Sequence, residues 1–313
     1  MKNLLIHLFI CFVLFCVCKN TNASNSKPQL AEVAKNQSDS LKFQLPEVPL
    51  MYAASEKRGE YLAMHFWDKF DFNDTAYIKK NVTEDAWVQY LTLLRMVPLN
   101  IAHESIQTTY RKAEINRLML NYFMDFADHY LYDPNSPYRN EELYIPMLET
   151  VIASDSLLNM EKIRPKDRLE LALKNRLGTK ATNFKYTLKS GKEAKMYDLK
   201  TDYTLIYFHN PGCHTCAEIT RKMKNSMVVN QLLSKKKITI LTVYPDEEVD
   251  DWKAHLSDLS DKWINGYDKD MILMYDNIYD LKAMPTLYLL NKNKIVLLKD
   301  APFKIVEEYL MPL

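Results

Sequence analysis

The stretch that decides the fold is Thr204–Cys216, which reads Thr-Leu-Ile-Tyr-Phe-His-Asn-Pro-Gly-Cys-His-Thr-Cys. Its first six residues, Thr204–His209, predict a buried strand, and Asn210–Gly212 predicts a turn after it. The residues that follow are typical of a helix, so we expect Cys213 at the first helical turn. Cys216 is then expected one turn further in, where the helix shields it.

The Cys-His-Thr-Cys sequence at this position indicates redox chemistry. A thiolate at Cys213 would face unpaired backbone amides and the positive end of the helix dipole, which favours the thiolate over the thiol. Cys216 could then resolve a mixed disulfide formed at Cys213. The competing interpretations are a structural disulfide and half of a zinc site. Zinc is disfavoured because there is no second cysteine pair and the histidines show no completing spacing.

Outward from this stretch, the chain alternates strands and helices from Gly178 to its end. We expect a hairpin over Asn183–Leu188 and Glu193–Asp198, a helix over Cys216–Leu233, a strand over Lys237–Tyr244, a helix over Val249–Leu259, strands over Thr286–Leu290 and Lys294–Leu298, and a helix over Pro302–Leu310. This order predicts an α/β domain with a central mixed sheet flanked by helices.

A proline at the head of a strand is the second informative element, in Ala283–Tyr288 (Ala-Met-Pro-Thr-Leu-Tyr). With the cysteine pair, it makes residues 177–313 resemble the thioredoxin-like domain of envelope thiol–disulfide oxidoreductases. Gly178, Ala181, Phe184 and Gly191 also resemble the extra hairpin of the membrane-tethered, peroxiredoxin-related branch.

The resemblance implies a cis Pro285 that lies against the cysteine pair, with the backbone of Met284 pairing with a bound polypeptide. His214 and Thr215, between the cysteines, complete the expected substrate-binding residues. A trans proline that simply starts a strand is the alternative.

The sequence also departs from the thioredoxin pattern. Tyr207 stands where thioredoxins carry a buried acid, so proton transfer from Cys216 lacks its usual carboxylate. His209 and Glu218 are the candidates for this role. His214 beside Cys213 would stabilise the thiolate and make the disulfide a stronger oxidant. An insertion is expected around Trp252–Tyr275, because Cys213 and Pro285 are 72 positions apart.

The N-terminus has the order of parts of an export signal over residues 1–23. Lys2 precedes the apolar run Leu4–Val17, which is short for a membrane span, and polar residues follow. Cleavage after Ala23 would leave Cys213 and Cys216 as the two thiols of the mature chain. The alternatives are an uncleaved signal anchor and a lipoprotein signal with Cys16 or Cys18 lipidated. Neither cysteine follows a small residue, because Phe15 and Val17 precede them.

Residues 24–46 are polar and aperiodic, which predicts a flexible tether. Residues 47–176 are expected to form a helical domain, because no glycine lies between Gly59 and Gly178. We expect helices over Ala53–Phe70, from near Thr83, over Ile101–Tyr130, over Tyr144–Met160 and over Pro165–Arg176. Ile115, Met119, Tyr122, Phe126 and Tyr130 recur at helical spacing as a packing seam. This half resembles an uncharacterised region found ahead of such domains in Gram-negative envelope proteins.

Composition narrows the class of function. With 41 Lys and Arg against 40 Asp and Glu, the chain lacks the basic excess of nucleic-acid-binding proteins, and 47% hydrophobic residues exclude a disordered tail protein. Trp87, Trp252 and Trp263 are expected in cores or interfaces. The acidic Asp246–Asp251 segment predicts a solvated helix start rather than a calcium site.

The leading hypothesis is an α+β two-domain thiol–disulfide oxidoreductase of the cell envelope or periplasm. Its expected partners are protein thiol or disulfide clients and an envelope redox donor, with no nucleic acid, no cofactor and no metal, and with membrane contact only through an N-terminal lipid anchor. The helical domain is expected to dock a client, the donor or a second copy. The alternative is a non-catalytic thioredoxin-fold module that binds peptides and holds a structural disulfide. A peroxidase is less favoured, because no clear arginine and threonine set surrounds the thiolate.

Overall fold

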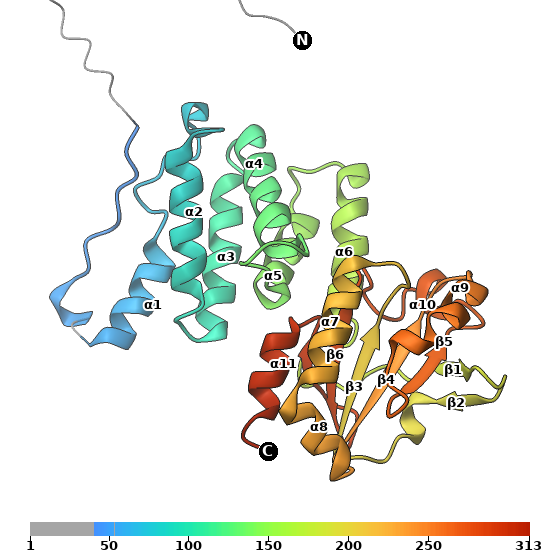
Figure 1. Cartoon of the computed structure of the whole chain (residues 1–313). Coiled ribbons are helices and arrows are strands. Elements are labelled where there is room, and N and C mark those ends of the chain that lie inside the picture. Colours follow the sequence, from blue (N-terminus) through green and yellow to red (C-terminus); the bar gives the residue numbers. More distant parts are fainter. Residues whose placement is uncertain (1–40, 53) are drawn as a thin grey trace, which may run out of the picture. The chain divides into compact units, whose positions relative to one another are not determined.

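The computed structural model describes residues 41–52 and 54–313, and Figure 1 shows their elements. The predicted export signal and most of the predicted tether lie outside the described residues. In the described part, no helix is both long and apolar enough to cross a membrane. The first half is helical and the second half is built on one sheet, as the sequence predicted.

The helical half contains four short 3-10 or π-helical turns and six α-helices within the described residues. In chain order they are η1 (Leu50–Tyr52), α1 (Ser55–His65), η2 (Thr75–Tyr77), α2 (Asn81–Leu94), α3 (Leu99–Ala113), α4 (Arg117–Ala127), the π-helical η3 (Asp128–Tyr132), α5 (Glu141–Ala153), η4 (Asn159–Lys162) and α6 (Ile163–Leu173), with the segment 133–140 joining η3 to α5 as an irregular connection.

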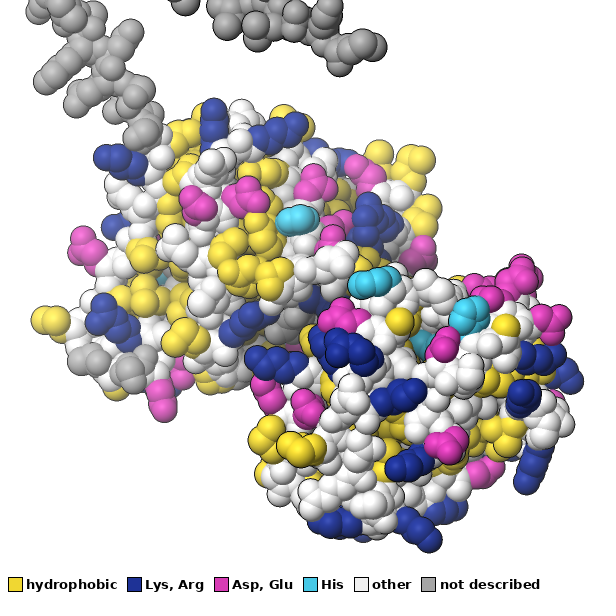
Figure 2. All heavy atoms as spheres, viewed as in Figure 1, with side chains coloured by type: hydrophobic (Ala, Val, Ile, Leu, Met, Phe, Trp, Pro, Cys, Tyr) yellow, Lys and Arg dark blue, Asp and Glu magenta, His cyan; other side chains and the backbone are white. Residues whose placement is uncertain are grey.

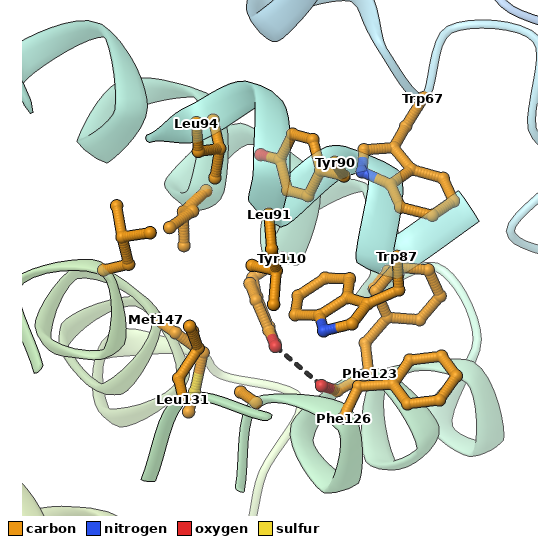
Figure 3. Packing of buried hydrophobic residues seen from close by; sticks show 14 of the residues in the cluster. Trp67, Trp87, Tyr90, Leu91, Leu94, Tyr110, Phe123, Phe126, Leu131 and Met147 are labelled. Carbon is orange, nitrogen blue, oxygen red and sulfur yellow. Dashed lines mark hydrogen bonds between the residues drawn. The ribbon is translucent and has the colours of Figure 1, made fainter. Parts of the chain in front are cut away.

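Aromatic side chains form the centre of the helical core, as Figure 3 shows. Trp87 is fully buried, as predicted, and its ring lies 5.6 Å from that of Phe123. The buried Tyr110 hydroxyl donates a 2.6 Å hydrogen bond to the Phe123 carbonyl, drawn as a dashed line in Figure 3. Large aromatic surfaces with satisfied hydroxyls make this core both apolar and specific in its packing.

The single helix predicted over Ile101–Tyr130 is wrong, because the chain forms α3 and α4 with a break between them. The Asn116 side chain accepts hydrogen bonds from the backbone N–H groups of Leu118 and Met119 and so caps a new helix. Ile115, predicted in the packing seam, lies in the break and is 65% exposed. Met119 and Phe126 of that seam are buried.

The predicted tether ends earlier than residue 46. Phe43 stacks on Phe66 with ring centroids 5.0 Å apart and contacts the Trp67 ring at 5.2 Å. Phe43, which lies within the predicted tether, therefore packs on the helical core.

The second half forms a seven-stranded sheet in the order β2-β1-β5-β4-β3-β6-β7. Its elements are β1 (Lys185–Leu188), β2 (Glu193–Lys195), η5 (Met196–Asp198), β3 (Tyr203–Phe208), α7 (His214–Asn225), α8 (Met227–Ser234), β4 (Ile238–Tyr244), α9 (Val249–Ala254), η6 (Leu256–Asp258), β5 (Ile264–Tyr267), α10 (Ile272–Tyr275), β6 (Thr286–Asn291), β7 (Val296–Lys299) and α11 (Phe303–Leu310). Strand β4 runs parallel to β3 and β5, and the other pairs are antiparallel.

Two features of this half differ from the prediction. The helix expected over Cys216–Leu233 is two helices, because the Ser226 hydroxyl accepts from the Val229 N–H and caps α8. The expected insertion around Trp252–Tyr275 contributes a strand, β5, to the sheet. Trp252 and Trp263, predicted as core or interface aromatics, are both buried.

Candidate functional site

Cys213 lies at the N-cap of α7, where the chain leaves the C-terminal end of the central strand β3. The turn before it passes through Gly212 at φ +74°, a left-handed conformation that favours glycine. The Cys213 Sγ accepts a hydrogen bond from the Cys216 backbone N–H at 3.2 Å. An amide at the start of the helix therefore points at the sulfur, which is the geometry of an N-cap.

The two sulfurs have different exposure and are not joined in a disulfide. Cys213 is half-buried, whereas Cys216, in the first turn of α7, is only 3% exposed. Burial raises the pKa of the Cys216 thiol to about 12. Cys213 can thus meet a partner sulfur while Cys216 remains protonated behind it.

The proline strand lies against the pair. The Met284–Pro285 bond is cis, as the resemblance implied, and Pro285 immediately precedes β6. Strand β6 pairs with β3, with Thr286 opposite Phe208, which brings the loop to the end of β3. The Cys213 thiol lies 3.8 Å from the Met284 carbonyl oxygen, which is the site's direct contact between the two motifs.

The hydroxyl of Tyr207, at the position where thioredoxins carry a buried acid, lies beside the backbone of Cys216. Tyr207 is fully buried, and its hydroxyl donates to the Cys216 carbonyl at 2.8 Å. The same hydroxyl lies 3.1 Å from the Thr220 Oγ1. Burial raises the pKa of Tyr207 well above its ordinary value, so the phenol stays protonated and holds the first turns of α7 on β3.

The two candidates for proton transfer have different surroundings. His209 is 5% exposed, its ring stacks on Tyr207 with centroids 5.1 Å apart, and its Nε2 has no hydrogen-bond partner in the described residues. Burial lowers the pKa of His209 to about 4, so the imidazole is neutral at neutral pH. Glu218 is instead solvent-accessible and pairs with Lys222 at 2.6 Å; the hydrogen bond from Lys222 lowers the pKa of Glu218.

Two hollows flank the cysteine pair. The smaller, about 410 Å³, is lined by both cysteines and by His209, Thr220 and Trp252 among others. His209 therefore shares a cavity with the pair, whereas Glu218 lines neither hollow.

The larger hollow, about 730 Å³, lies along Met284, Pro285 and Thr215. Its other side comes from the helical half, from Pro134, Asn135 and Arg139. His214 is exposed and lines neither hollow. We refer to the larger hollow as the groove.

Sequence reasoning missed the helical-half residues of the groove and the α7 cations Arg221 and Lys224 beside it. The charge run Arg221-Lys222-Met223-Lys224 was visible in the sequence as a basic end of the predicted helix. No local pattern marks Asn135 as a neighbour of Pro285, because 150 residues separate them. Within the described residues, no group of three or more His, Cys, Asp or Glu side chains is placed to hold a metal ion.

Two families match the chain. Residues 17–175 match a domain of unknown function (DUF5106), and residues 201–296 match a family described as thioredoxin-like. No protein of curated function matches the chain.

Solved structures give a longer match. A crystal structure of a thioredoxin-like protein from Bacteroides caccae is 51% identical with a TM-score of 0.84, and the match covers 86% of this chain and 98% of that one. The C-terminal domain of an uncharacterized protein from Bacteroides fragilis is 53% identical, covering 44% of this chain and 98% of that one with a TM-score of 0.43. A domain of a possible thiol-disulfide isomerase from Cytophaga hutchinsonii is 25% identical, covering 45% and 94% with a TM-score of 0.37.

Proposed function

The chain belongs to the thioredoxin-like proteins, with a DUF5106 region ahead of the thioredoxin fold, and we propose that it is a thiol–disulfide oxidoreductase acting on protein clients. The observation that carries the proposal is the asymmetry of the two sulfurs. Cys213 is accessible at the N-cap of α7 and lies 3.8 Å from the Met284 carbonyl, while Cys216 is buried one turn behind it.

The arrangement supports a two-step exchange. The Cys213 thiolate attacks one sulfur of a client disulfide, a Cys213–client disulfide forms, and the other client sulfur leaves as a thiolate. Cys216 then loses its proton and attacks Cys213, which releases the client's second thiol and leaves a Cys213–Cys216 disulfide. The client is reduced by two electrons and the enzyme is oxidised by two. The same steps in reverse oxidise a client.

The second step requires removal of a proton from a thiol whose pKa is about 12. We assign acceptance of this proton to the client thiolate released in the first step, because the His209 imidazole, with a pKa of about 4, is too weak a base for it although its ring lines the same hollow as Cys216. Glu218 is not assigned this role, because its carboxylate pairs with Lys222 outside that hollow. Tyr207 acts as a positioning residue through its bond to the Cys216 carbonyl.

We further propose export to the cell envelope, which rests on the sequence of residues 1–23. An oxidising compartment suits a chain whose thiols outside that signal are Cys213 and Cys216. The proposed partners are protein clients with a thiol or disulfide and an envelope redox donor. The electron transfer uses the two cysteines and needs no cofactor.

Trapping of mixed disulfides tests the proposal. In a chain with Cys11, Cys16 and Cys18 replaced by serine, Cys216→Ser should accumulate client adducts on Cys213 that dithiothreitol releases. Cys213→Ser is the matched control and should trap none. The form with both Cys213 and Cys216 should also reduce insulin. Absence of both adducts and insulin reduction would favour the alternative, a peptide-binding module whose disulfide is structural.

A further inference from the structure

The groove beside the cis proline has walls from both halves of the chain. Thr215 and Ile219 of α7 line one side, Met284 and Pro285 line the side nearest the cysteine pair, and the segment after η3 contributes Asn135. A client held at Met284 would therefore extend along a surface that a thioredoxin fold alone does not supply.

The wall from the helical half is fixed in place. The Arg139 guanidinium pairs with the Asp300 carboxylate at 3.1 Å and also donates to the Asp300 carbonyl. It donates a further bond of 3.2 Å to the Pro134 carbonyl. Both charged side chains are less than one-fifth exposed, so this pair joins the segment 134–139 to the residue that follows β7. These contacts hold the segment 134–139 in place as one wall of the groove.

The charge around the groove is uneven. Among the charged residues that line it, Lys222 pairs with Glu218 at 2.6 Å, Arg139 pairs with Asp300, and Lys304 pairs with Glu308 at 3.8 Å. The carboxylate of Glu307 also lines the groove and accepts a hydrogen bond from the Ser226 hydroxyl. In the described part of the chain, Arg221 and Lys224 make no ion pair with an acidic side chain; Lys224 donates to the Asp258 backbone carbonyl. Figure 2 shows Lys and Arg side chains gathered over α7.

Arg221 has a particular place among these cations because it lines both hollows that flank the cysteine pair. An extended polypeptide whose cysteine lies at Cys213 would enter a hollow lined by Arg221 whichever of the two its flank follows. Unpaired positive charge in a hollow that a polypeptide enters favours a negatively charged partner.

We propose that the groove selects client segments that carry acidic residues beside the reacting cysteine, with Arg221 as the main specificity-determining residue and Asn135 at the opposite wall. The proposal rests on the proposed oxidoreductase function and names the class of polypeptide that it prefers. The expected client is a polypeptide, because the groove extends from the cations of α7 to the residues of the helical half.

The test uses three peptides of equal length with one central cysteine, flanked by glutamates, by lysines or by serines, each joined by a disulfide to 5-thio-2-nitrobenzoate. The protein is the full chain with Cys11, Cys16, Cys18 and Cys216 replaced by serine. Attack by Cys213 on the peptide sulfur forms a Cys213–peptide disulfide, breaks the peptide–thionitrobenzoate bond and releases the coloured thiolate. Absorbance gives the rate, and the mass of the adduct identifies which sulfur was attacked.

At low salt the glutamate peptide should react roughly tenfold faster than the lysine peptide, and the ratio should fall toward one at high salt. Arg221→Glu should abolish or invert the ratio. Lys292→Glu, the same charge change at an exposed lysine that lines neither hollow, should leave it unchanged. Asn135→Glu should slow the glutamate peptide and leave the serine peptide unaffected.

Equal rates for the glutamate and lysine peptides at low salt would overturn the proposal while leaving the oxidoreductase function intact, since the serine peptide would still form its adduct. An effect of Arg221→Glu without any effect of Asn135→Glu would overturn the role of the helical wall. Failure of all three peptides to form an adduct on Cys213 would instead count against the oxidoreductase function itself.

Discussion

The Tyr207 hydroxyl donates a 2.8 Å hydrogen bond to the backbone carbonyl of Cys216. This bond joins the central strand β3 to the first turn of α7, the element that carries both cysteines. A phenol can do this without changing charge, whereas a carboxylate at the same position would titrate with the thiols. The Tyr207 hydroxyl is therefore a neutral group that holds the backbone of Cys216, and the neutral His209 ring stacks on the Tyr207 ring.

Replacing Tyr207 with phenylalanine should destabilise the fold by about 1–2 kcal/mol, since the buried Cys216 carbonyl and Thr220 hydroxyl each lose a hydrogen-bond partner. The matched control is Tyr288→Phe. Tyr288 is also a fully buried strand residue, but its hydroxyl has no partner in the described residues, so its loss should cost nothing or stabilise. Urea unfolding of both variants gives the comparison, and equal losses would contradict this role of the Tyr207 hydroxyl.

The pH dependence of stability should reveal His209. Its pKa is about 4 in the folded chain against 6.5 for an unburied histidine, so the unfolded chain binds more protons between these values. The contribution of His209 to the free energy of unfolding is fully present above pH 6.5. It decreases by about 3 kcal/mol as the pH falls to 4. His209→Phe should flatten unfolding free energy over this window.

His255, whose side chain is 43% exposed, provides the control for that measurement. Asp251 raises the pKa of His255 through a backbone hydrogen bond, so its small contribution has the opposite sign and is lost as the pH rises. His255→Phe should leave the loss of stability below pH 6.5 in place. If His209→Phe keeps the wild-type profile, the histidine is not buried as a neutral ring.

The local parts of the site could be predicted because each depends on a short segment. A buried strand, a turn with glycine and a cysteine pair place Cys213 at the start of a helix whatever surrounds them. The cis Pro285 at the head of a strand was implied by the resemblance to the thioredoxin-like family. The break between α3 and α4 is also local in origin, but Asn116 looks like an ordinary polar helix residue until its side chain is seen to cap.

Strand β5 was missed for a different reason. Its sequence, Ile-Asn-Gly-Tyr, contains an Asn-Gly pair that is typical of turns. Tyr186 of β1 explains the glycine, since a Cβ at Gly266 would lie 2.8 Å from the Tyr186 Cδ2. Such close approach between strands 80 residues apart, like the contact of Arg139 with Asp300, is set by tertiary packing and leaves no local pattern.

The two thiols should differ sharply in alkylation. A thiol pKa of about 12 leaves Cys216 with roughly 1000-fold less thiolate than an ordinary cysteine, and its sulfur is buried as well. At pH 8, iodoacetamide should modify Cys213 in Cys216→Ser within minutes and leave Cys216 in Cys213→Ser largely unmodified until urea is added. Peptide mapping by mass spectrometry follows each site. Similar native rates at the two cysteines would refute the assignment of attacking and resolving sulfurs.

A buried charge cluster should make the helical half necessary for the stability of the cis-proline loop. Glu141 of α5 pairs with Lys282 at 3.0 Å and with Lys299 at 2.7 Å, and both ammonium groups are less than one-tenth exposed. Lys282 lies three residues before Pro285 and also pairs with Asp280, whereas Lys299 has Glu141 as its acidic partner in the described residues. Glu141→Gln should therefore lower the unfolding free energy by about 2–4 kcal/mol, because it leaves buried positive charge without compensation.

The control for this change is Glu170→Gln, which removes an ion pair of similar length with Lys174 on a carboxylate that is 71% exposed. Its cost should stay below about 0.5 kcal/mol, since water screens the pair. Hydrogen exchange separates a local effect from a global one: in Glu141→Gln, the amides of residues 280–286 should lose protection more than those of β4. Uniform loss of protection across the sheet would mean that Glu141 stabilises the domain without a particular hold on the loop beside Cys213.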